Sequence, residues 1–551
     1  MVDRLAFAVS SRDTLLQQAG DVEFDLLVIG GGITGAGIAL DAVTRGLSVC
    51  LVEKHDFASG TSSKSTKLIH GGLRYLKQFE FGLVKEVGRE RAILHQLAPH
   101  LVVPEKMVLP LIKGGSLGKT MTSIGLYIYD FLADVEGEDK RRMLDKDEVK
   151  EIEPLLPEST LLGGSIYAEY RTDDARLTIE VVKTAFRHGA LLFNYLECRE
   201  FLEEEETVRG IKCLDHLTGD NIILRAKNIV NAGGPWVDEL RSKVEPISGK
   251  RLYLTKGVHL VVPRSKLPLR HAIYFDVPHD NRMIFAIPRL DITYIGTTDT
   301  YYEGDKDQIR VSHEDVNYLL GAVNQTFAIK TLQADDIVSS WAGLRPLIYE
   351  DGKSASEISR KDEIFEAKDG LLSIAGGKLT GYRKMAERIV DKVMERMHPD
   401  TAGQWPTRTE SISLTEDSFQ NYTECQAFII KIKELCEQGG LDEIDARYLV
   451  HNYGKKAIDI YEDMARYAEY SPDIALIYAE LDHARDFEMM ATPLDYLMRR
   501  TGRIFFRPES IRLVEDHIFQ YFADRYLYTP DQLYQQKLDW REAVRSITVF
   551  Q

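Results

Sequence analysis

Residues 25–53 read D-L-L-V-I-G-G-G-I-T-G-A-G-I-A-L-D-A-V-T-R-G-L-S-V-C-L-V-E, and this stretch decides the fold. After its first residue, the segment 25–30 is apolar on both faces, as buried parallel strands are. Residues 33–45 are rich in alanine and isoleucine and predict a helix, and residues 47–53 predict the next strand. The stretch therefore predicts a β-α-β unit that opens an α/β domain.

The turn between the first strand and the helix carries the pattern G-x-G-x-x-G, with glycines at Gly30, Gly32 and Gly35. In such a turn the first glycine permits the bend, the second lets a pyrophosphate approach the backbone, and the third lets helix and strand pack closely. The helix N-terminus offers unpaired N–H groups to phosphates, and Glu53 can accept hydrogen bonds from ribose hydroxyls. The unit predicts dinucleotide binding without choosing between NAD and FAD.

Length and charge limit the other possibilities. A chain of 551 residues predicts two or three domains. The net charge of −17 argues against nucleic acid as a partner but allows a small anionic substrate held by a few clustered arginines. The five cysteines form no C-x-x-C pair and no zinc-like spacing, so we expect reduced thiols, a cytosolic protein and no metal site. Neither a targeting peptide nor a membrane-spanning stretch is expected.

The rest of the chain suggests how the domains are interleaved. Residues 228–232 and 371–375 look like central strands that return to the nucleotide-binding sheet, and each runs into a glycine pair. Between them, residues 257–262, 283–288 and 293–296 show a β pattern typical of a mixed sheet. From about residue 406 the periodicity is helical almost to the end, which predicts a separate all-α domain.

Six further motifs carry a family resemblance. They are D-F-A-S-G-T-S-S-K-S-T-K-L-I-H-G-G-L-R-Y (56–75), N-A-G-G-P-W (231–236), T-K-G-V-H (255–259), I-G-T-T-D (295–299), G-L-R-P-L (343–347) and G-G-K-L-T (376–380). Together they resemble the FAD-dependent glycerol-3-phosphate dehydrogenases of the bacterial, aerobic type, within the D-amino-acid-oxidase-like flavoproteins. The resemblance covers residues 20–395 in the expected order, and D-Y-L-M-R-R-T (495–501) extends it into the helical region.

The resemblance implies an architecture with three parts. A Rossmann-like FAD-binding domain would comprise residues 20–98, 170–245 and 340–395. A mixed-β substrate domain would comprise residues 99–169 and 246–339, and an all-α C-terminal domain residues 396–551.

The resemblance also implies an activity. The enzyme would oxidise sn-glycerol 3-phosphate to dihydroxyacetone phosphate by hydride transfer from C2 to flavin N5, and would pass the electrons to a membrane quinone. The nearest alternative is a glycerol-3-phosphate oxidase that uses O₂ and releases H₂O₂. An amine or amino-acid oxidase would have no use for a pair of arginines that bind a phosphate, the role expected of Arg345 and Arg360. A non-catalytic flavin-binding scaffold would not need these arginines, Lys378 or His259.

By the same resemblance, the FAD would contact residues from five segments of the chain. These residues are Gly30, Gly32, Gly35, Glu53, Ser62, Ser63, Lys67, Gly233, Gly376, Gly377, Lys378 and Thr380. Outside its family context, the Ser/Thr-rich run 61–66 would be interpreted as a solvated loop. Its position directly after the ribose-binding acid favours the cofactor instead.

The substrate and the chemistry need cations and a proton acceptor. The resemblance implies that Arg345 and Arg360 contact the phosphate, and that Arg74 and Tyr75 are further substrate contacts. Lys378 is expected beneath the flavin, where an ammonium stabilises negative charge on the reduced ring. The same residues also have bland interpretations: Arg360 as a surface arginine and Lys378 as a solvated lysine at a helix start.

His259 is the preferred general base, because an imidazole has an ordinary pKa near neutrality. A histidine in a strand is more often structural, and its place in the K-G-V-H motif is what favours a role in the site. Arg345 and Lys378 complete the expected catalytic set.

A dehydrogenase of this kind must deliver its electrons at a membrane. Residues 113–132 combine apolar and aromatic side chains with two lysines and could rest on an anionic membrane surface, or could pack against the substrate domain. We expect a cytoplasmic protein in peripheral contact with the inner face of the cell membrane. The helical domain could serve homodimerisation, acceptor docking or stability, and the sequence does not choose among them.

Overall fold

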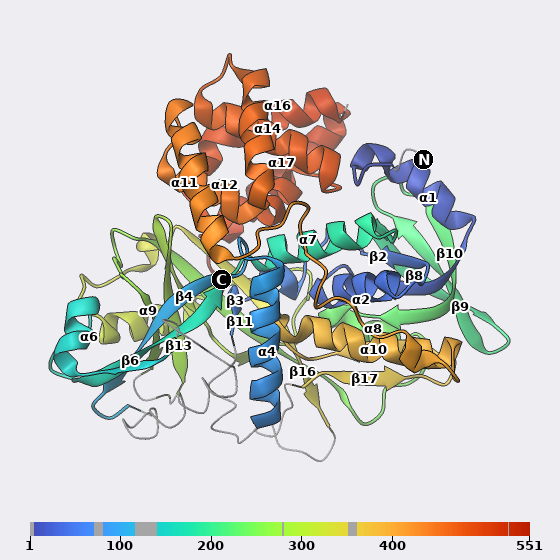
Figure 1. The fold of residues 1–551 in the computed structure, drawn as a ribbon, viewed down its shortest axis with the longest axis horizontal. Coiled ribbons are helices and arrows are strands. Elements are labelled where there is room, and N and C mark those ends of the chain that lie inside the picture. Colours follow the sequence, from blue (N-terminus) through green and yellow to red (C-terminus); the bar gives the residue numbers. More distant parts are fainter. Residues whose placement is uncertain are drawn as a thin grey trace.

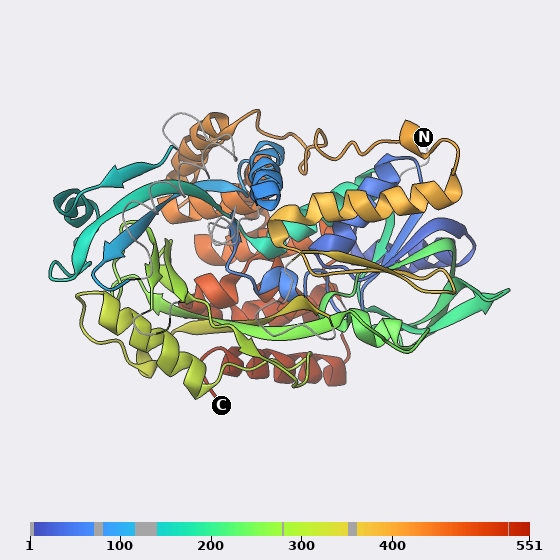
Figure 2. The same ribbon diagram turned by 90° about the horizontal axis from the view of Figure 1, so that it is seen from below.

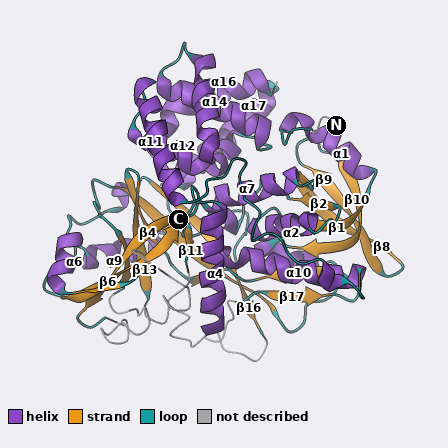
Figure 3. Ribbon diagram, viewed as in Figure 1, coloured by secondary structure: helices purple, strands orange, loops and turns teal. Residues whose placement is uncertain are grey.

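In a computed structural model, the structure describes residues 5–70, 81–115, 140–277, 280, 282–350, 361–526 and 528–551. Within these ranges the chain forms two sheets and a helical cap (Figure 1). The C-terminal helices gather on one side of the molecule, at the top of the view in Figure 3. The all-α character of the C-terminal region is therefore confirmed, with its first long helix beginning at Tyr422.

The eight-stranded sheet is the nucleotide-binding unit. Its strand order is β17-β18-β10-β1-β2-β7, with β9 beside β10 and β8 beside β9. β18, β10, β1, β2 and β7 run parallel to one another, which confirms the predicted β-α-β unit and the two returning strands. Its strands are β1 (Glu23–Ile29), β2 (Val49–Val52), β7 (Leu191–Phe193), β8 (Leu196–Glu204), β9 (Thr207–Asp215), β10 (Asn221–Asn231), β17 (Glu363–Glu366) and β18 (Leu372–Ala375).

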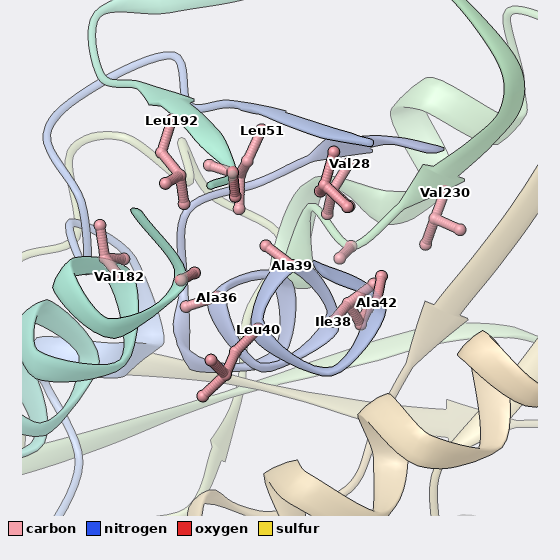
Figure 4. Close-up of a cluster of buried hydrophobic side chains, with 14 of the residues drawn as sticks. Val28, Ala36, Ile38, Ala39, Leu40, Ala42, Leu51, Val182, Leu192 and Val230 are labelled. Carbon is pink, nitrogen blue, oxygen red and sulfur yellow. The ribbon is translucent and has the colours of Figure 1, made fainter. Parts of the chain in front are cut away.

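Helices cover this sheet, and their buried side chains form a hydrophobic core with those of the strands. α2 lies against the sheet, where its small and branched side chains meet apolar side chains of β1, β2, β7 and β10 (Figure 4). α7 and α10 pack beside α2, and α10 runs along it in the turned view of Figure 2. The helices around this sheet are α1 (Arg12–Gly20), α2 (Ile33–Thr44), α4 (Phe81–Leu97), α7 (Asp174–Arg187), α8 (Val237–Arg241) and α10 (Tyr382–Met397).

The ten-stranded mixed sheet forms the second unit. Its order is β15-β11-β14-β13-β12-β4-β6-β3, with β16 beside β11 and β5 beside β6. Its elements are β3 (Leu68–Ile69), β4 (Val103–Ile112), β5 (Arg142–Leu144), β6 (Leu161–Arg171), β11 (Arg251–Pro263), β12 (Ala272–Asp276), β13 (Met283–Arg289), β14 (Ile292–Gly296), β15 (Thr300–Tyr301) and β16 (Ser339–Tyr349), with helices α6 (Lys146–Ile152) and α9 (His313–Thr326).

One expected domain boundary needs correction. A boundary at residue 340 would assign β16 to the FAD-binding unit, but β16 pairs with β11 along its whole length in the ten-stranded sheet. The motif G-L-R-P-L lies on this strand, and its apolar residues gave no sign of which sheet the strand would join. The nucleotide-binding sheet resumes only at β17.

The C-terminal domain is tied to the nucleotide-binding unit by buried charges. Asp56, three residues beyond Glu53, accepts hydrogen bonds from both Arg499 and Arg500. Burial alone would raise the pKa of the Asp56 carboxyl, but the two guanidinium groups hold it at about 2. The domain comprises α11 (Tyr422–Gln438), α12 (Glu443–Tyr453), α13 (Ala457–Asp463), α14 (Pro472–Phe487), a π-helical turn (Asp495–Arg500), α15 (Arg503–Phe506), α16 (Ile511–Arg525) and α17 (Pro530–Ser546).

We predict that Asp56→Ala lowers the thermal unfolding midpoint by roughly 10 °C. The substitution leaves two buried arginines without their shared partner, which lowers the free energy of unfolding by about 3–5 kcal/mol. In domains of this size, each kcal/mol shifts the unfolding midpoint by roughly 2–4 °C. Differential scanning calorimetry measures the midpoint. Arg447→Ala, which removes an exposed ion pair with Glu443, is the control and should leave the midpoint unchanged. An equal midpoint for the two variants would contradict this account.

Candidate functional site

The predicted cofactor residues converge on one edge of the nucleotide-binding sheet. Gly30, Glu53 and Gly376 come directly after the ends of β1, β2 and β18, and Gly233 lies two residues after the end of β10. These four strands are adjacent and parallel, so their carboxyl ends meet at the same edge. Ligands of open α/β sheets bind in the crevice outside this edge.

The glycine turn leaves no room for side chains. A Cβ on Gly35 would lie 1.8 Å from the carbonyl oxygen of Gly30, and a Cβ on Gly30 would lie 2.5 Å from the carbonyl oxygen of Ala232. Gly30 also has a φ of +115°, which side chains disfavour. The turn is therefore formed from backbone alone, as a pyrophosphate-binding turn requires.

Glu53 and the serine-rich loop line the same turn. The Glu53 carboxylate accepts hydrogen bonds from the Gly31 N–H (2.7 Å) and the His55 N–H (2.9 Å). The Ser62 hydroxyl accepts a hydrogen bond from the Ile33 N–H at the start of α2 (2.9 Å) and lies beside Gly32. The loop 61–67 thus runs over the N-terminus of α2, next to the residues that the glycine pattern picked out.

Lys67 fixes the shape of this loop. Its ammonium donates to the Ser63 carbonyl at 3.0 Å and to the Asp174 carboxylate at 2.5 Å, and it is buried. Asp174 also accepts from the Ser65 N–H. The predicted contact of Lys67 with FAD stays a prediction, whereas its interactions in the structure hold the loop. Sequence reasoning missed Asp174, although its place at the start of a helix marked a stable position for a carboxylate.

The segment after β18 adds two left-handed glycines. Gly376 and Gly377 have φ values of +82° and +73°, and a Cβ on Gly376 would lie 2.6 Å from the Lys361 carbonyl oxygen. Lys378 follows at the start of a short 3₁₀ turn, Leu379–Gly381. Thr380 is buried in that turn, with its hydroxyl 3.4 Å from the His70 carbonyl oxygen. These positions place the G-G-K-L-T motif at the same edge of the sheet.

His259 and Arg345 belong to the ten-stranded sheet and share one of its faces. His259 is paired with Trp341 and Thr255 with Arg345, and side chains of directly opposed residues point to the same side. Between these pairs lies the pair Gly257–Gly343, which has no side chains. The face between the imidazole and the guanidinium therefore has a glycine floor.

Arg345 reaches back along this floor. A Cβ on Gly257 would lie 2.3 Å from a guanidinium nitrogen of Arg345. The guanidinium donates to Thr297 Oγ1 (2.8 Å), the Thr298 carbonyl (3.1 Å) and Asp299 Oδ1 (3.2 Å), and 29 % of the side chain remains exposed. The I-G-T-T-D motif therefore orients Arg345.

His259 is buried and stacked. Its Nε2 lies 3.0 Å from Thr66 Oγ1, in the loop that runs over α2, and its ring is parallel to the Trp341 indole with 4.8 Å between centroids. Burial lowers the pKa of His259 well below 6.5, and the charges of Arg345 and Lys67 lower it further. The imidazole is therefore neutral at neutral pH and can accept a proton, although it is a weaker base than the imidazole of ordinary pKa that the sequence led us to expect.

Three predicted substrate contacts cannot be placed. Arg74, Tyr75 and Arg360 lie outside the described residues, as does most of the predicted membrane-facing stretch 113–132. All five cysteines are free and buried. The parts of the chain that the structure describes contain no group of three or more metal-ligating side chains, and no helix in them is long and apolar enough to span a membrane.

The described residues fit a bound FAD. The turn at Gly30–Gly35 would hold the pyrophosphate, Glu53 would receive the ribose hydroxyls, and the loop 61–67 would lie along the cofactor. The predicted catalytic residues His259 and Arg345 come from the other sheet, and Thr66 contacts His259 from the cofactor loop. This arrangement agrees with a site in which the ten-stranded sheet binds the substrate next to a cofactor held by the eight-stranded sheet.

Comparison with known proteins agrees with this arrangement. Residues 25–383 match the family described as FAD dependent oxidoreductase, and residues 380–533 match the C-terminal domain of alpha-glycerophosphate oxidase. The chain is 47 % identical over 534 residues to an aerobic glycerol-3-phosphate dehydrogenase of Staphylococcus aureus, covering 96 % of each protein.

Solved structures give the same result. A glycerol-3-phosphate dehydrogenase from Bacillus halodurans complexed with FAD is 40 % identical, covers 99 % of each chain and has a TM-score of 0.84. An L-alpha-glycerophosphate oxidase from Mycoplasma pneumoniae, 17 % identical, covers 68 % of this chain and 95 % of its own with a TM-score of 0.55, and it shares the fold. The chain belongs to the FAD-dependent oxidoreductases, and within them to the family of the aerobic glycerol-3-phosphate dehydrogenases.

Proposed function

We propose that this protein oxidises sn-glycerol 3-phosphate to dihydroxyacetone phosphate with FAD and passes the electrons to a membrane quinone. The observation that carries the proposal is the placement of Arg345 and His259 on one glycine-floored face, next to the cofactor loop. A phosphorylated alcohol needs both groups, a cation for its phosphate and a proton acceptor for its hydroxyl. The near full-length similarity to enzymes of this name supports the same substrate.

The residues of the chain divide the work between binding and proton transfer. Arg345, held by Thr297 and Asp299, binds the phosphate with N–H groups oriented before the substrate arrives. Neutral His259 accepts the proton of the C2 hydroxyl as the C–H bond breaks. FAD supplies the two-electron acceptor for the hydride that leaves C2. Arg360, Arg74 and Tyr75 stay proposed substrate contacts, and Lys378 a proposed stabiliser of negative charge.

The acceptor is a separate part of the proposal. A quinone is favoured by the names of the relatives, which are dehydrogenases. The alternative is O₂ with release of H₂O₂, the chemistry of an oxidase. Peripheral contact with the cytoplasmic face of a membrane follows from the quinone, and a homodimer is a further proposal that the sequence raised.

The glycine turn can be tested through its effect on cofactor binding. Gly35→Ala should give protein with less than about one tenth of the wild-type FAD content, because the new methyl group meets a backbone oxygen at 1.8 Å and backbone atoms cannot turn aside. The flavin absorbance of the purified protein measures the content. Gly321→Ala is the matched control, since it lies in a helix with nothing within 4 Å of its Cβ. A yellow, fully loaded Gly35→Ala protein would refute the assigned pyrophosphate turn.

The role of Arg345 can be tested with substrates that have or lack a phosphate. Arg345→Gln should lower kcat/KM for sn-glycerol 3-phosphate by on the order of 10–100-fold, because it removes a charge-assisted hydrogen bond worth about 1.5–3 kcal/mol. The slow reaction with glycerol, which has no phosphate, should not change. Arg251→Gln, at the exposed end of the same ladder, should leave both substrates unaffected. Equal losses with both substrates would mean that Arg345 does not bind the phosphate.

A further inference from the structure

A segment of the C-terminal domain lies between the two sheets. We name residues 499–506 (R-R-T-G-R-I-F-F) the wedge segment, and all of its residues are buried. At one end it holds the nucleotide-binding unit through Arg499 and Arg500 on Asp56. At the other end it contacts the ten-stranded sheet, where the Ser339 hydroxyl of β16 donates to the Ile504 carbonyl at 2.9 Å.

Two phenylalanines of the wedge segment pack against Trp341. The rings of Phe505 and Phe506 lie 5.4 Å and 6.1 Å from Trp341, measured between centroids. The Trp341 indole N–H donates to the Ser65 carbonyl at 3.0 Å, in the loop 61–67. Trp341 is therefore fixed by the C-terminal domain on one side and by the cofactor loop on another, and it is 3 % exposed.

Trp341 in turn presents its face to His259. The two rings are 4.8 Å apart and inclined by 13°, a stacked arrangement. The other neighbours of the imidazole also restrict it: its ring lies across Gly296 of β14, where a Cβ would be 2.1 Å from Cδ2. Among the residues that the structure describes, Nδ1 is buried and has no hydrogen-bond partner. Nε2 lies toward the Thr66 hydroxyl.

The charged and titratable groups that face His259 are few. Arg345 lies along the same face of the sheet, and Lys67 lies beneath Trp341 with its ammonium 5.5 Å from the indole. The Tyr294 ring is 6.5 Å from the imidazole, and Asp174 lies beyond Lys67, to which it is bonded. Burial and the charges of these two cations therefore oppose protonation of the imidazole.

We propose that Trp341, held in place by the wedge segment, is a positioning residue that keeps water from His259 and fixes the orientation of its ring. The C-terminal helical domain thereby takes part in the chemistry of the flavin site. The inference rests on the proposed role of His259 as the proton acceptor, and it adds a function for the domain that packs above both sheets (Figure 1).

Loss of the indole has a specific consequence. In Trp341→Leu, water reaches the imidazole and the burial that opposes protonation is relieved, so the pKa of His259 rises toward 6.5. A protonated imidazole cannot accept the substrate proton. With a pKa near 6.5, flavin reduction at pH 6 should be about fourfold slower than at pH 8. Wild type, whose His259 pKa lies well below 6.5, should show almost no difference.

The experiment uses the FAD-loaded protein and two measurements. The pKa of His259 is read from the NMR signals of ¹³C-labelled histidine, with the signal assigned by its loss in His259→Gln. Anaerobic stopped-flow absorbance gives the rate of flavin reduction by sn-glycerol 3-phosphate at pH 6 and pH 8. The variants are Trp341→Leu, Trp341→Phe and Phe505→Leu. Trp540→Phe is the control, since it changes a buried tryptophan that packs on Phe519, away from the site.

The expected pattern separates positioning from general loss of stability. Trp341→Leu should raise the His259 pKa and bring the fourfold pH effect, Phe505→Leu should shift both in the same direction by less, and Trp341→Phe should keep nearly wild-type values because it keeps an aromatic stack. Trp540→Phe should change neither. If Trp341→Leu does not fold, Phe505→Leu carries the test.

Two outcomes distinguish the inference from the function on which it rests. An unchanged His259 titration in Trp341→Leu and Phe505→Leu, with rates lowered equally at both pH values, would overturn the positioning role. A normal rate of flavin reduction in His259→Gln would instead overturn the proton-acceptor role, whatever the titration shows.

Discussion

The close approach of three backbone segments at Gly30, Gly35 and Ala232 is the constraint on which the site depends. Because no side chain fits there, the N-terminus of α2 lies at the carboxyl edge of the sheet, where the Gly31 and Ile33 N–H groups donate to Glu53 and Ser62. Glu53 and the loop 61–67 are then placed around the same turn by β2 and by the buried pair Lys67–Asp174. The second sheet brings His259 to this loop through Thr66. A side chain in the glycine turn would therefore prevent cofactor binding, and the groups placed around the cofactor would lose their function.

Much of this could be predicted from the sequence, because the decisive signals are local. The buried strands, the alanine-rich helix and the glycine spacing all lie within residues 25–53 and agree with one another. The strands that return at residues 228 and 371 were predictable for the same reason, since each is a short apolar run followed by glycines. The motif resemblance added the substrate and the cofactor, and the similarity to relatives along nearly the whole chain agrees with both.

Long-range pairings could not be predicted in the same way. Nothing in the apolar residues of β16 shows that it joins the sheet of β11 rather than that of β18. The partnership of Lys67 with Asp174, and that of Asp56 with two arginines more than 400 positions away, depend on the fold as a whole. The sequence left homodimerisation, acceptor docking and stability open as roles of the C-terminal domain. Its contacts with Asp56 and Trp341 are the basis for a further proposed role at the flavin site, which the sequence did not suggest.

The most direct test of the proposed function is to mix FAD-loaded protein with sn-glycerol 3-phosphate under anaerobic conditions and follow the absorbance of oxidised flavin. We expect full bleaching by this substrate and none by the same concentration of glycerol, followed by rapid return of the absorbance with a soluble quinone and slow return in air. Glycerol itself reacts only slowly, so the comparison is made within the time in which sn-glycerol 3-phosphate bleaches the flavin completely. Rapid return in air with release of peroxide would identify an oxidase. An absorbance that does not fall with sn-glycerol 3-phosphate would contradict the substrate assigned here.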